Sequence, residues 1–254
     1  TTRLEIMDRY MKESDMVRIQ YASKYRGVSN AWKKWKGIIR GLDRLNAIEK
    51  KEKTEKDFSY WVSSSDSRQE TYGEILPSFA SVYGEIGHYQ LVSDYLYEAV
   101  AAVELFRRVG SIHDMFENRD SLSLIRNYME DFFRDYHMPV DRDIFAAMME
   151  AYYQDIDAEF HPEFLSEAVK KYKGDFSRMA DKFYDKSLLD TPDEFFGLLN
   201  IYESKPERAM RKLGKDPMYQ YYKAFRDFYM ARVIPEKGVL DASLEQLYKK
   251  YVTG

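Results

Sequence analysis

The stretch Tyr21-Ala-Ser-Lys-Tyr-Arg-Gly-Val-Ser-Asn-Ala-Trp-Lys-Lys-Trp-Lys-Gly37 decides how the chain folds. From about Val28 to Ile48, apolar residues recur at spacings of three and four, which is the period of a helix with one apolar face. The opposite face carries lysines and arginines. This pattern predicts a long helix from about Val28, and Gly27 before it allows a break or a sharp bend.

The same helical pattern continues along the rest of the chain. No segment alternates apolar and polar residues for long, and Asn-Gly and Asp-Gly turns are absent. Hydrophobic residues make up 44% of the 254 residues and charged residues 32%, which is enough apolar surface for a core. No Gly-, Ser- or Pro-rich linker divides the chain. The sequence predicts one all-α, multi-helix, bundle-like domain over residues 1–254.

Capping residues and prolines place the predicted helices. Six segments begin at a side chain whose oxygen can accept a backbone N–H: Ser14, Ser121, Asp141, Asp175, Thr191 and Asp216. Pro77 predicts a kink or break near Leu76. The predicted helices cover residues 2–13, 14–25, 28–48, 57–63, 66–83, 87–109, 119–136, 141–156, 162–171, 175–187, 192–201, 204–213, 216–232 and 240–252.

Charge is unevenly distributed along the sequence. Residues 1–56 hold 15 Lys and Arg against 8 Asp and Glu, and the remainder holds 24 against 35. The charged run 49–56 has Glu and Lys at helical i,i+4 spacing, and we expect it in solvent. The asymmetry divides the domain into a basic N-terminal helical hairpin, 1–56, and an acidic helical bundle, 57–254. Such halves attract each other, or they mark a charged cleft or a nucleic-acid face.

Residues that carry common catalytic chemistry do not form any recognised motif. The absence of Cys excludes disulfides, thiolate nucleophiles and Cys-based zinc sites. No His belongs to a His-Glu-x-x-His motif or pairs with another His at helical spacing; the four are His88, His113, His137 and His161. There is no Gly-rich phosphate loop, and no apolar run is long enough to cross a bilayer. We therefore predict no catalytic residue, metal or cofactor in this chain.

Three interpretations of the N-terminal segment remain open from the residues alone. In the first, Trp32 and Trp35 are core residues and the lysines face water. In the second, the basic and aromatic residues bind nucleic acid, which the sequence pI of about 5.7 disfavours. In the third, the amide oxygen of Asn30 accepts hydrogen bonds from a charged amine. The simpler alternative to the third is that Ser29 or Asn30 caps the long helix.

The segment Met16–Gly37 resembles the start of the helical domain in bacterial serine dipeptidyl peptidases of the dipeptidyl peptidase 7 and 11 family. Looser similarity extends through Phe58–Trp61, Tyr95–Glu98 and Asp141–Phe145. In that family, a chymotrypsin-like double β-barrel holds a Ser-His-Asp triad, and an inserted α-helical domain caps the cleft. These enzymes release dipeptides from peptide N-termini, in the periplasm or at the surface of Gram-negative bacteria. They need no metal or organic cofactor.

The resemblance implies that this chain is the helical cap and not a whole peptidase. The barrel motifs are missing from the sequence, so the chain alone should be inactive and its two ends should lie close together. Its implied partners are peptide substrates and the barrel domain. Asn30 matches the family's Asn that helps to hold the substrate α-amino group, with Ser29, Trp32 and Tyr25 as supporting neighbours. A helical protein-interaction module, or a nucleic-acid-binding helical domain, are the alternative functions.

Overall fold

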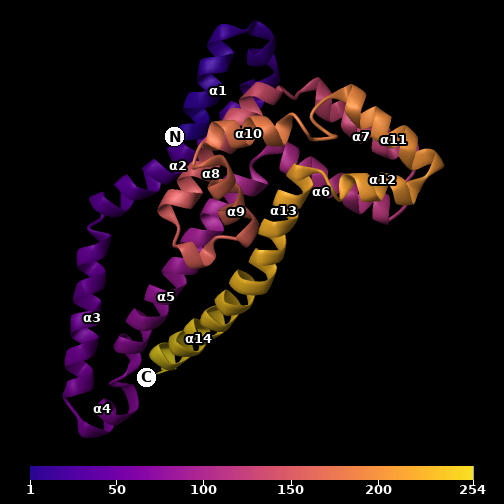
Figure 1. Cartoon of the computed structure of the whole chain (residues 1–254). Helices are drawn as coiled ribbons and strands as arrows, with labels where there is room; N and C mark the ends of the chain where they lie inside the picture. Colours follow the sequence, from indigo (N-terminus) through magenta and orange to yellow (C-terminus); the bar gives the residue numbers. More distant parts are fainter. Residues whose placement is uncertain (254) are drawn as a thin grey trace. The chain divides into compact units, whose positions relative to one another are not determined.

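The computed structural model describes residues 1–253, of which Thr253 is described by its backbone only. Every regular element within these residues is helical, which confirms the predicted all-α class (Figure 1). No helix among them is long and apolar enough to cross a membrane. The helices form two compact units: unit 1 comprises residues 1–26 and 92–230, and unit 2 comprises residues 27–91 and those from 231 onward.

The two units have other boundaries than residue 56, and the division into a basic hairpin and an acidic bundle stays a prediction. Helix α3 (Ala47–Ser63) runs through that position, since Glu and Lys at i,i+4 spacing in 49–56 support a continuous helix. Helix α2 (Asp15–Arg44) supplies residues to both units. Residue 1 belongs to unit 1 and the C-terminal end to unit 2, so the closeness of the two ends stays a prediction.

Unit 1 is built around an aromatic core. The Phe106 ring meets the Phe145 ring edge-on at 5.1 Å between centroids and stacks on the Tyr221 ring at 5.6 Å. These three fully buried side chains join α6, α8 and α13. The helical elements of unit 1 besides the first part of α2 are α1 (Thr2–Glu13), the end of α5, π-helix η1 (Tyr97–Ala101), α6 (Glu104–Glu117), α7 (Leu122–Arg134), α8 (Met138–Asp155), 3-10 helix η2 (Ala158–Phe160), α9 (Glu163–Tyr172), α10 (Phe176–Tyr184), α11 (Pro192–Ser204), α12 (Pro206–Leu213), α13 (Pro217–Phe228) and the start of π-helix η3 (Tyr229–Val233).

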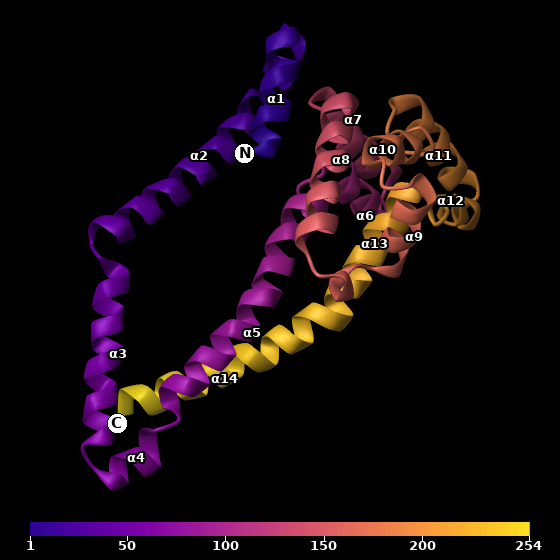
Figure 2. The same cartoon turned by 60° about the vertical axis from the view of Figure 1, so that its left-hand side comes forward.

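Unit 2 is a smaller group of helices joined by contacts between partly exposed aromatic rings. It contains the rest of α2, α3, α4 (Asp66–Tyr72), most of α5 (Ile75–Leu96), the end of η3 and α14 (Ile234–Thr253). Helices α5 and α14 lie side by side (Figures 1 and 2). The Phe79 ring of α5 meets the Tyr248 ring of α14 at 4.9 Å, and the Phe58 ring of α3 meets the Tyr251 ring at 5.0 Å.

Most of the predicted capping residues begin helices as expected. Ser14, Ser121, Asp175, Thr191 and Asp216 each accept a hydrogen bond from a backbone N–H in the first turn of the helix that follows. Pro77 lies in the first turn of α5, just after the turn at residues 73–74 that separates α4 from α5. A side-chain oxygen before an apolar stripe therefore located these helix starts correctly.

Asp141 was predicted to cap its own helix, and this is wrong. Helix α8 already begins at Met138, with Pro139 in its first turn, so Asp141 lies inside the helix. Its buried carboxylate accepts hydrogen bonds from the backbone N–H groups of Glu104 at 2.7 Å and Leu105 at 3.0 Å. Asp141 thus caps α6, which begins 37 residues earlier in the sequence.

The prediction of two separate helices on either side of Gly27 is also wrong. Helix α2 continues through Gly27 to Arg44, and the chain turns at Asn46, whose φ of 48° is left-handed. A single Gly in a helix costs only about 1 kcal/mol relative to Ala, which the flanking helical turns overcome. Asn is one of the few residues that adopts a left-handed conformation readily, so the turn between α2 and α3 forms there (Figure 2).

Candidate functional site

Asn30, the predicted amine ligand, lies in the interior of α2 within unit 2. Its side chain is exposed and makes no hydrogen bond to any residue in the part of the chain that the structure describes. The alternative in which Ser29 or Asn30 caps a helix is wrong, because α2 begins fourteen residues earlier and Ser14 caps it with a 3.4 Å hydrogen bond from the Val17 N–H. The Asn30 amide is therefore available to a ligand, and its role stays a prediction.

The helix face that carries Asn30 is open. Gly37 and Gly41 follow at i+7 and i+11 and so lie on the same face of α2. A Cβ atom added at either glycine would meet no atom within 4 Å. Lys33 and Lys34 lie one turn beyond Asn30. A ligand or a second domain can approach the α2 backbone closely on this face.

The predicted supporting residues are not all on the face of Asn30. Trp32, two positions further on, is rotated by about 200° around the helix axis and so lies on nearly the opposite side. Ser29 is half-buried in unit 2, and Tyr25 is half-buried in the part of α2 that belongs to unit 1. The helix geometry therefore gives Trp32 no direct contact with a ligand held by Asn30.

A second feature of α2 in unit 2 is a row of exposed apolar side chains. One of the three interpretations of this segment placed Trp32 and Trp35 in the core, but their relative exposures are 38% and 63%. The Lys36 Nζ atom lies 4.4 Å from the centre of the Trp32 ring. We call this row the α2 apolar stripe; its members are Trp32, Trp35, Ile38, Ile39 and Leu42. Contiguous exposed apolar surface of this kind marks an interaction site.

Unit 1 contains a buried polar cluster that the sequence did not reveal. The Asp141 carboxylate accepts a hydrogen bond from the Tyr184 hydroxyl at 2.8 Å, in addition to those from the two N–H groups of α6. Burial, followed by the nearby Glu104 carboxylate, raises the pKa of Asp141 to about 6. The Lys24 Nζ atom of α2 binds the Glu104 carboxylate at 2.6 Å. Through these contacts the cluster joins the start of α2 to helices α6, α8 and α10 of unit 1.

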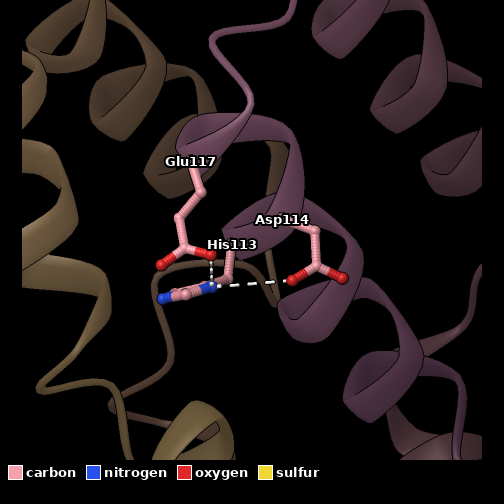
Figure 3. Close-up of side chains that lie close together, drawn as sticks. All are labelled: His113, Asp114 and Glu117. Carbon is pink, nitrogen blue, oxygen red and sulfur yellow. Dashed lines mark ion pairs between the residues drawn. The ribbon is translucent and has the colours of Figure 1, made fainter.

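His113, Asp114 and Glu117 form the only group of potential metal ligands found in residues 1–253 (Figure 3). The Nδ1 atom of His113 lies 3.7 Å from a carboxylate oxygen of each acid, which is too long for a hydrogen bond. The His113 ring stacks on the Tyr219 ring at 4.6 Å, and both carboxylates are exposed. All three residues come from one helix, and no fourth ligand approaches among the described residues. The arrangement is typical of a surface ion-pair cluster.

The other histidines lie at helix ends or on an exposed helix. His137 immediately precedes α8, and the His161 Nε2 atom lies 2.8 Å from the Ile156 carbonyl oxygen. Burial lowers the pKa of both imidazoles. His88 is exposed on α5.

Comparison with known proteins identifies the family. The family model for peptidase S46 matches residues 1–254. The Asp/Glu-specific dipeptidyl-peptidase of Flavobacterium psychrophilum is 29% identical over 98% of this chain and 35% of its own length. Dipeptidyl-peptidase 7 of Porphyromonas gingivalis is 30% identical over 84% of this chain and 30% of its own length. The chain therefore spans about a third of the length of these relatives.

Solved structures show the same fold. The crystal structure of Porphyromonas endodontalis DPP11 in complex with the dipeptide Arg-Glu matches 99% of this chain and 37% of that protein, with a TM-score of 0.74 and 22% identity. A second crystal structure of Porphyromonas endodontalis DPP11 matches with a TM-score of 0.76. The chain is thus an all-α domain similar to one part of a larger protein. Together with the family match over its whole length, this shows that the chain belongs to the peptidase S46 family.

Proposed function

We propose that the chain is the helical domain of a serine exopeptidase that releases dipeptides from peptide N-termini. In this proposal the domain covers the active-site cleft and recognises the free α-amino group of the substrate. Relatives named as dipeptidyl peptidases support the activity, and they are about three times as long as this chain. The additional length leaves room for a catalytic domain, to which we assign the serine nucleophile.

The observation that carries the proposal is the exposed surface of α2 in unit 2. The α2 apolar stripe leaves large side chains in water, which is unfavourable unless another surface covers them. On another face of the same helix, Asn30 presents an amide with no hydrogen-bond partner among the described residues. The apolar face of α2 is suited to packing against a partner domain. The Asn30 amide on another face is suited to binding a ligand. We assign the partner to the catalytic domain and the ligand to the peptide amine.

The chemistry of Asn30 fits amine recognition. Its amide oxygen can accept a hydrogen bond from an ammonium group, and hydrogen bonds to a charged donor are stronger than neutral ones. An acylated amine carries no charge and fewer donors, so it would leave polar groups of the site unpaired. Closure of a helical domain over the bound peptide would also exclude water from the reaction. These properties select free N-termini over chain interiors.

Two further parts of the proposal follow from the family resemblance. We place the enzyme in the periplasm or at the surface of a Gram-negative bacterium, and we assign no metal or organic cofactor to its reaction. Fractionation of cells that express the full-length protein tests the location. Retention of activity in the presence of a strong chelator tests the independence from metals.

The test of Asn30 uses the full-length peptidase that contains this domain. We expect Asn30→Ala to lower kcat/KM for dipeptide release by about tenfold to a hundredfold, the effect of one charge-assisted hydrogen bond. Asn127→Ala is the matched control, because Asn127 is an exposed Asn on α7 in unit 1. The wild type should not cleave a substrate whose N-terminus is acetylated.

The outcomes separate the two parts of the proposal. If Asn30→Ala matches the control, amine recognition by Asn30 is refuted while the domain assignment stands. If no peptide yields a dipeptide, the exopeptidase function is refuted. A protein-interaction module then becomes the better explanation, since the α2 apolar stripe equally suits a separate protein partner.

A further inference from the structure

One cavity lies entirely within unit 1 and has no role in the proposed function. Its volume is about 520 Å³, within the range of small-molecule sites. Residues from α5, η1, α6, α7, α13 and η3 line it. Both π-helical turns contribute, and such turns are frequent at functional sites. We call it the arginine pocket.

Positive charge dominates the lining of the pocket. Three arginines, Arg107, Arg108 and Arg226, line it together with a single carboxylate, Asp114. Arg226 is paired with the Asp227 carboxylate at 3.3 Å. Arg107 and Arg108 have no acidic partner within ion-pair distance among residues 1–253. Two guanidinium groups in a concave site without partners attract an anion.

Arg108 is held in place by aromatic rings. Its guanidinium carbon lies 4.5 Å from the centre of the Tyr128 ring and 4.9 Å from that of the Phe132 ring. Stacking of this kind fixes a guanidinium plane while leaving its edge free for hydrogen bonds. Because the side chain is already ordered, less conformational entropy is lost when an anion binds.

The remaining wall is apolar and aromatic. Leu96, Val100 and Phe225 are buried beside the pocket, and tyrosine side chains complete the lining: Tyr97, Tyr128, Tyr222 and Tyr229. The Tyr222 ring reaches its place because residue 110 is glycine: a Cβ atom there would lie 2.6 Å from the ring. Rings and aliphatic side chains of this kind stack on an aromatic or apolar body.

We propose that the arginine pocket binds a small organic carboxylate with an aromatic or apolar body. Arg107 and Arg108 bind the carboxylate, and the tyrosine wall contacts the body. The planar guanidinium fork matches a carboxylate in shape, and the apolar wall would leave a compact anion such as phosphate poorly contacted. The inference is independent of amine recognition by Asn30, since the ligand group has the opposite charge and the residues belong to the other unit.

The experiment is calorimetric titration of the 254-residue chain with three probes. N-acetyl-phenylalanine carries the carboxylate and the ring, N-acetyl-phenylalaninamide keeps the ring without the charge, and inorganic phosphate keeps a charge without the ring. We expect saturable binding of the first probe at millimolar concentration or below. The affinity should fall with rising salt, and the other two probes should bind at least about tenfold more weakly.

Three variants locate the site. Arg107→Gln should weaken binding of N-acetyl-phenylalanine by about tenfold or more. Ala101→Trp should block the cavity while keeping every charge, because Ala101 is an exposed residue of its lining. Arg178→Gln removes an exposed arginine on α10, outside the pocket, and should leave binding unchanged.

Three results would overturn the proposal: no saturable binding of N-acetyl-phenylalanine, equal binding of its amide, or equal losses in Arg107→Gln and Arg178→Gln. Tighter binding of phosphate than of the carboxylate would contradict the assigned ligand class. Circular dichroism of each variant checks that it remains folded, and Ala101→Trp gives an answer even if Arg107→Gln perturbs the fold.

Discussion

At the scale of single residues, Asp141 shows how one carboxylate can join distant parts of the chain. It lies in α8, caps α6 and receives the Tyr184 hydroxyl of α10. A buried acceptor with three donors leaves all three unpaired when it is removed. The stability of unit 1 should therefore depend on this residue more than on any ordinary helix cap.

We expect Asp141→Ala to lower the free energy of unfolding by about 3 kcal/mol or more, because buried donors lose their acceptor. Asp175→Ala removes an exposed cap of α10 and should cost only about 1 kcal/mol. Urea unfolding followed by far-UV circular dichroism compares the two variants. Equal losses would mean that Asp141 acts as an ordinary cap.

Asp190 gives the fold a dependence on pH. Burial, and then the neighbouring Glu194 carboxylate, raise its pKa to about 8. Between the unfolded pKa near 4 and this value, the folded state binds more protons than the unfolded state. The contribution of Asp190 to the free energy of unfolding is therefore present in acid and is lost as the pH rises to about 8. Lowered pKa values at His137 and His161 act in the opposite direction near neutral pH.

The comparison of wild type with Asp190→Asn isolates this carboxyl group, since the histidines are common to both proteins. The difference in unfolding free energy between the two proteins should shift in favour of Asp190→Asn as the pH rises from about 5 to about 8. Urea unfolding at several pH values measures it. A pH-independent difference would show that Asp190 titrates normally.

At the scale of helices, Gly37 in α2 and Gly110 in α6 differ in whether their surroundings leave room for a side chain. Gly37 has open space around it, so Gly37→Ala should stabilise the chain by up to about 1 kcal/mol through helix propensity. Gly110 lies against the Tyr222 ring, so Gly110→Ala should destabilise it by about 1–3 kcal/mol through overpacking. The same substitution thus has opposite signs in two helices, which thermal unfolding can measure. Stabilisation by both would refute the close approach of Tyr222.

The helix boundaries also show what local sequence can predict. Caps at Ser121, Asp175, Thr191 and Asp216 were predicted correctly, because a capping hydrogen bond joins residues two or three positions apart. The role of Asp141 was missed, since its N–H partners lie 36 and 37 residues away. The end of α2 was misplaced because Gly27 carries a propensity cost that neighbouring turns can overcome, whereas Asn46 adopts the left-handed turn.

At the scale of the whole molecule, the sequence predicts the all-α class, but it does not predict that the α2 apolar stripe is exposed. Helical periodicity shows that a helix has an apolar face, but it does not show what covers that face. The interpretation that places Trp32 and Trp35 in the core follows from this periodicity, although the described residues leave both side chains exposed. From the residues alone, amine binding by Asn30 was one of three open interpretations, and the family resemblance favoured it. The arginine pocket combines residues from six elements, so no local motif could reveal it.

The exposure of the α2 apolar stripe leads to a prediction that separates folding from assembly. Leu42 and Leu124 have nearly equal exposures of 51% and 52%, the first in the stripe and the second on α7 in unit 1. In the 254-residue chain, Leu42→Glu and Leu124→Glu should each change the unfolding free energy by less than about 0.5 kcal/mol, because neither side chain is buried. In the full-length peptidase, a catalytic domain packed on the stripe would have to bury the new carboxylate of Leu42→Glu.

We therefore expect Leu42→Glu to lower both dipeptide release and thermal stability in the full-length peptidase, while Leu124→Glu leaves both unchanged. Activity assays and thermal unfolding of the full-length proteins, beside the same variants in the 254-residue chain, provide the comparison. Equal behaviour of the two variants in the full-length protein would show that the stripe remains in water there. The proposal that it packs on a catalytic domain would then be wrong. A loss confined to Leu42→Glu would instead identify the stripe as the surface by which this helical domain packs against the proposed catalytic domain.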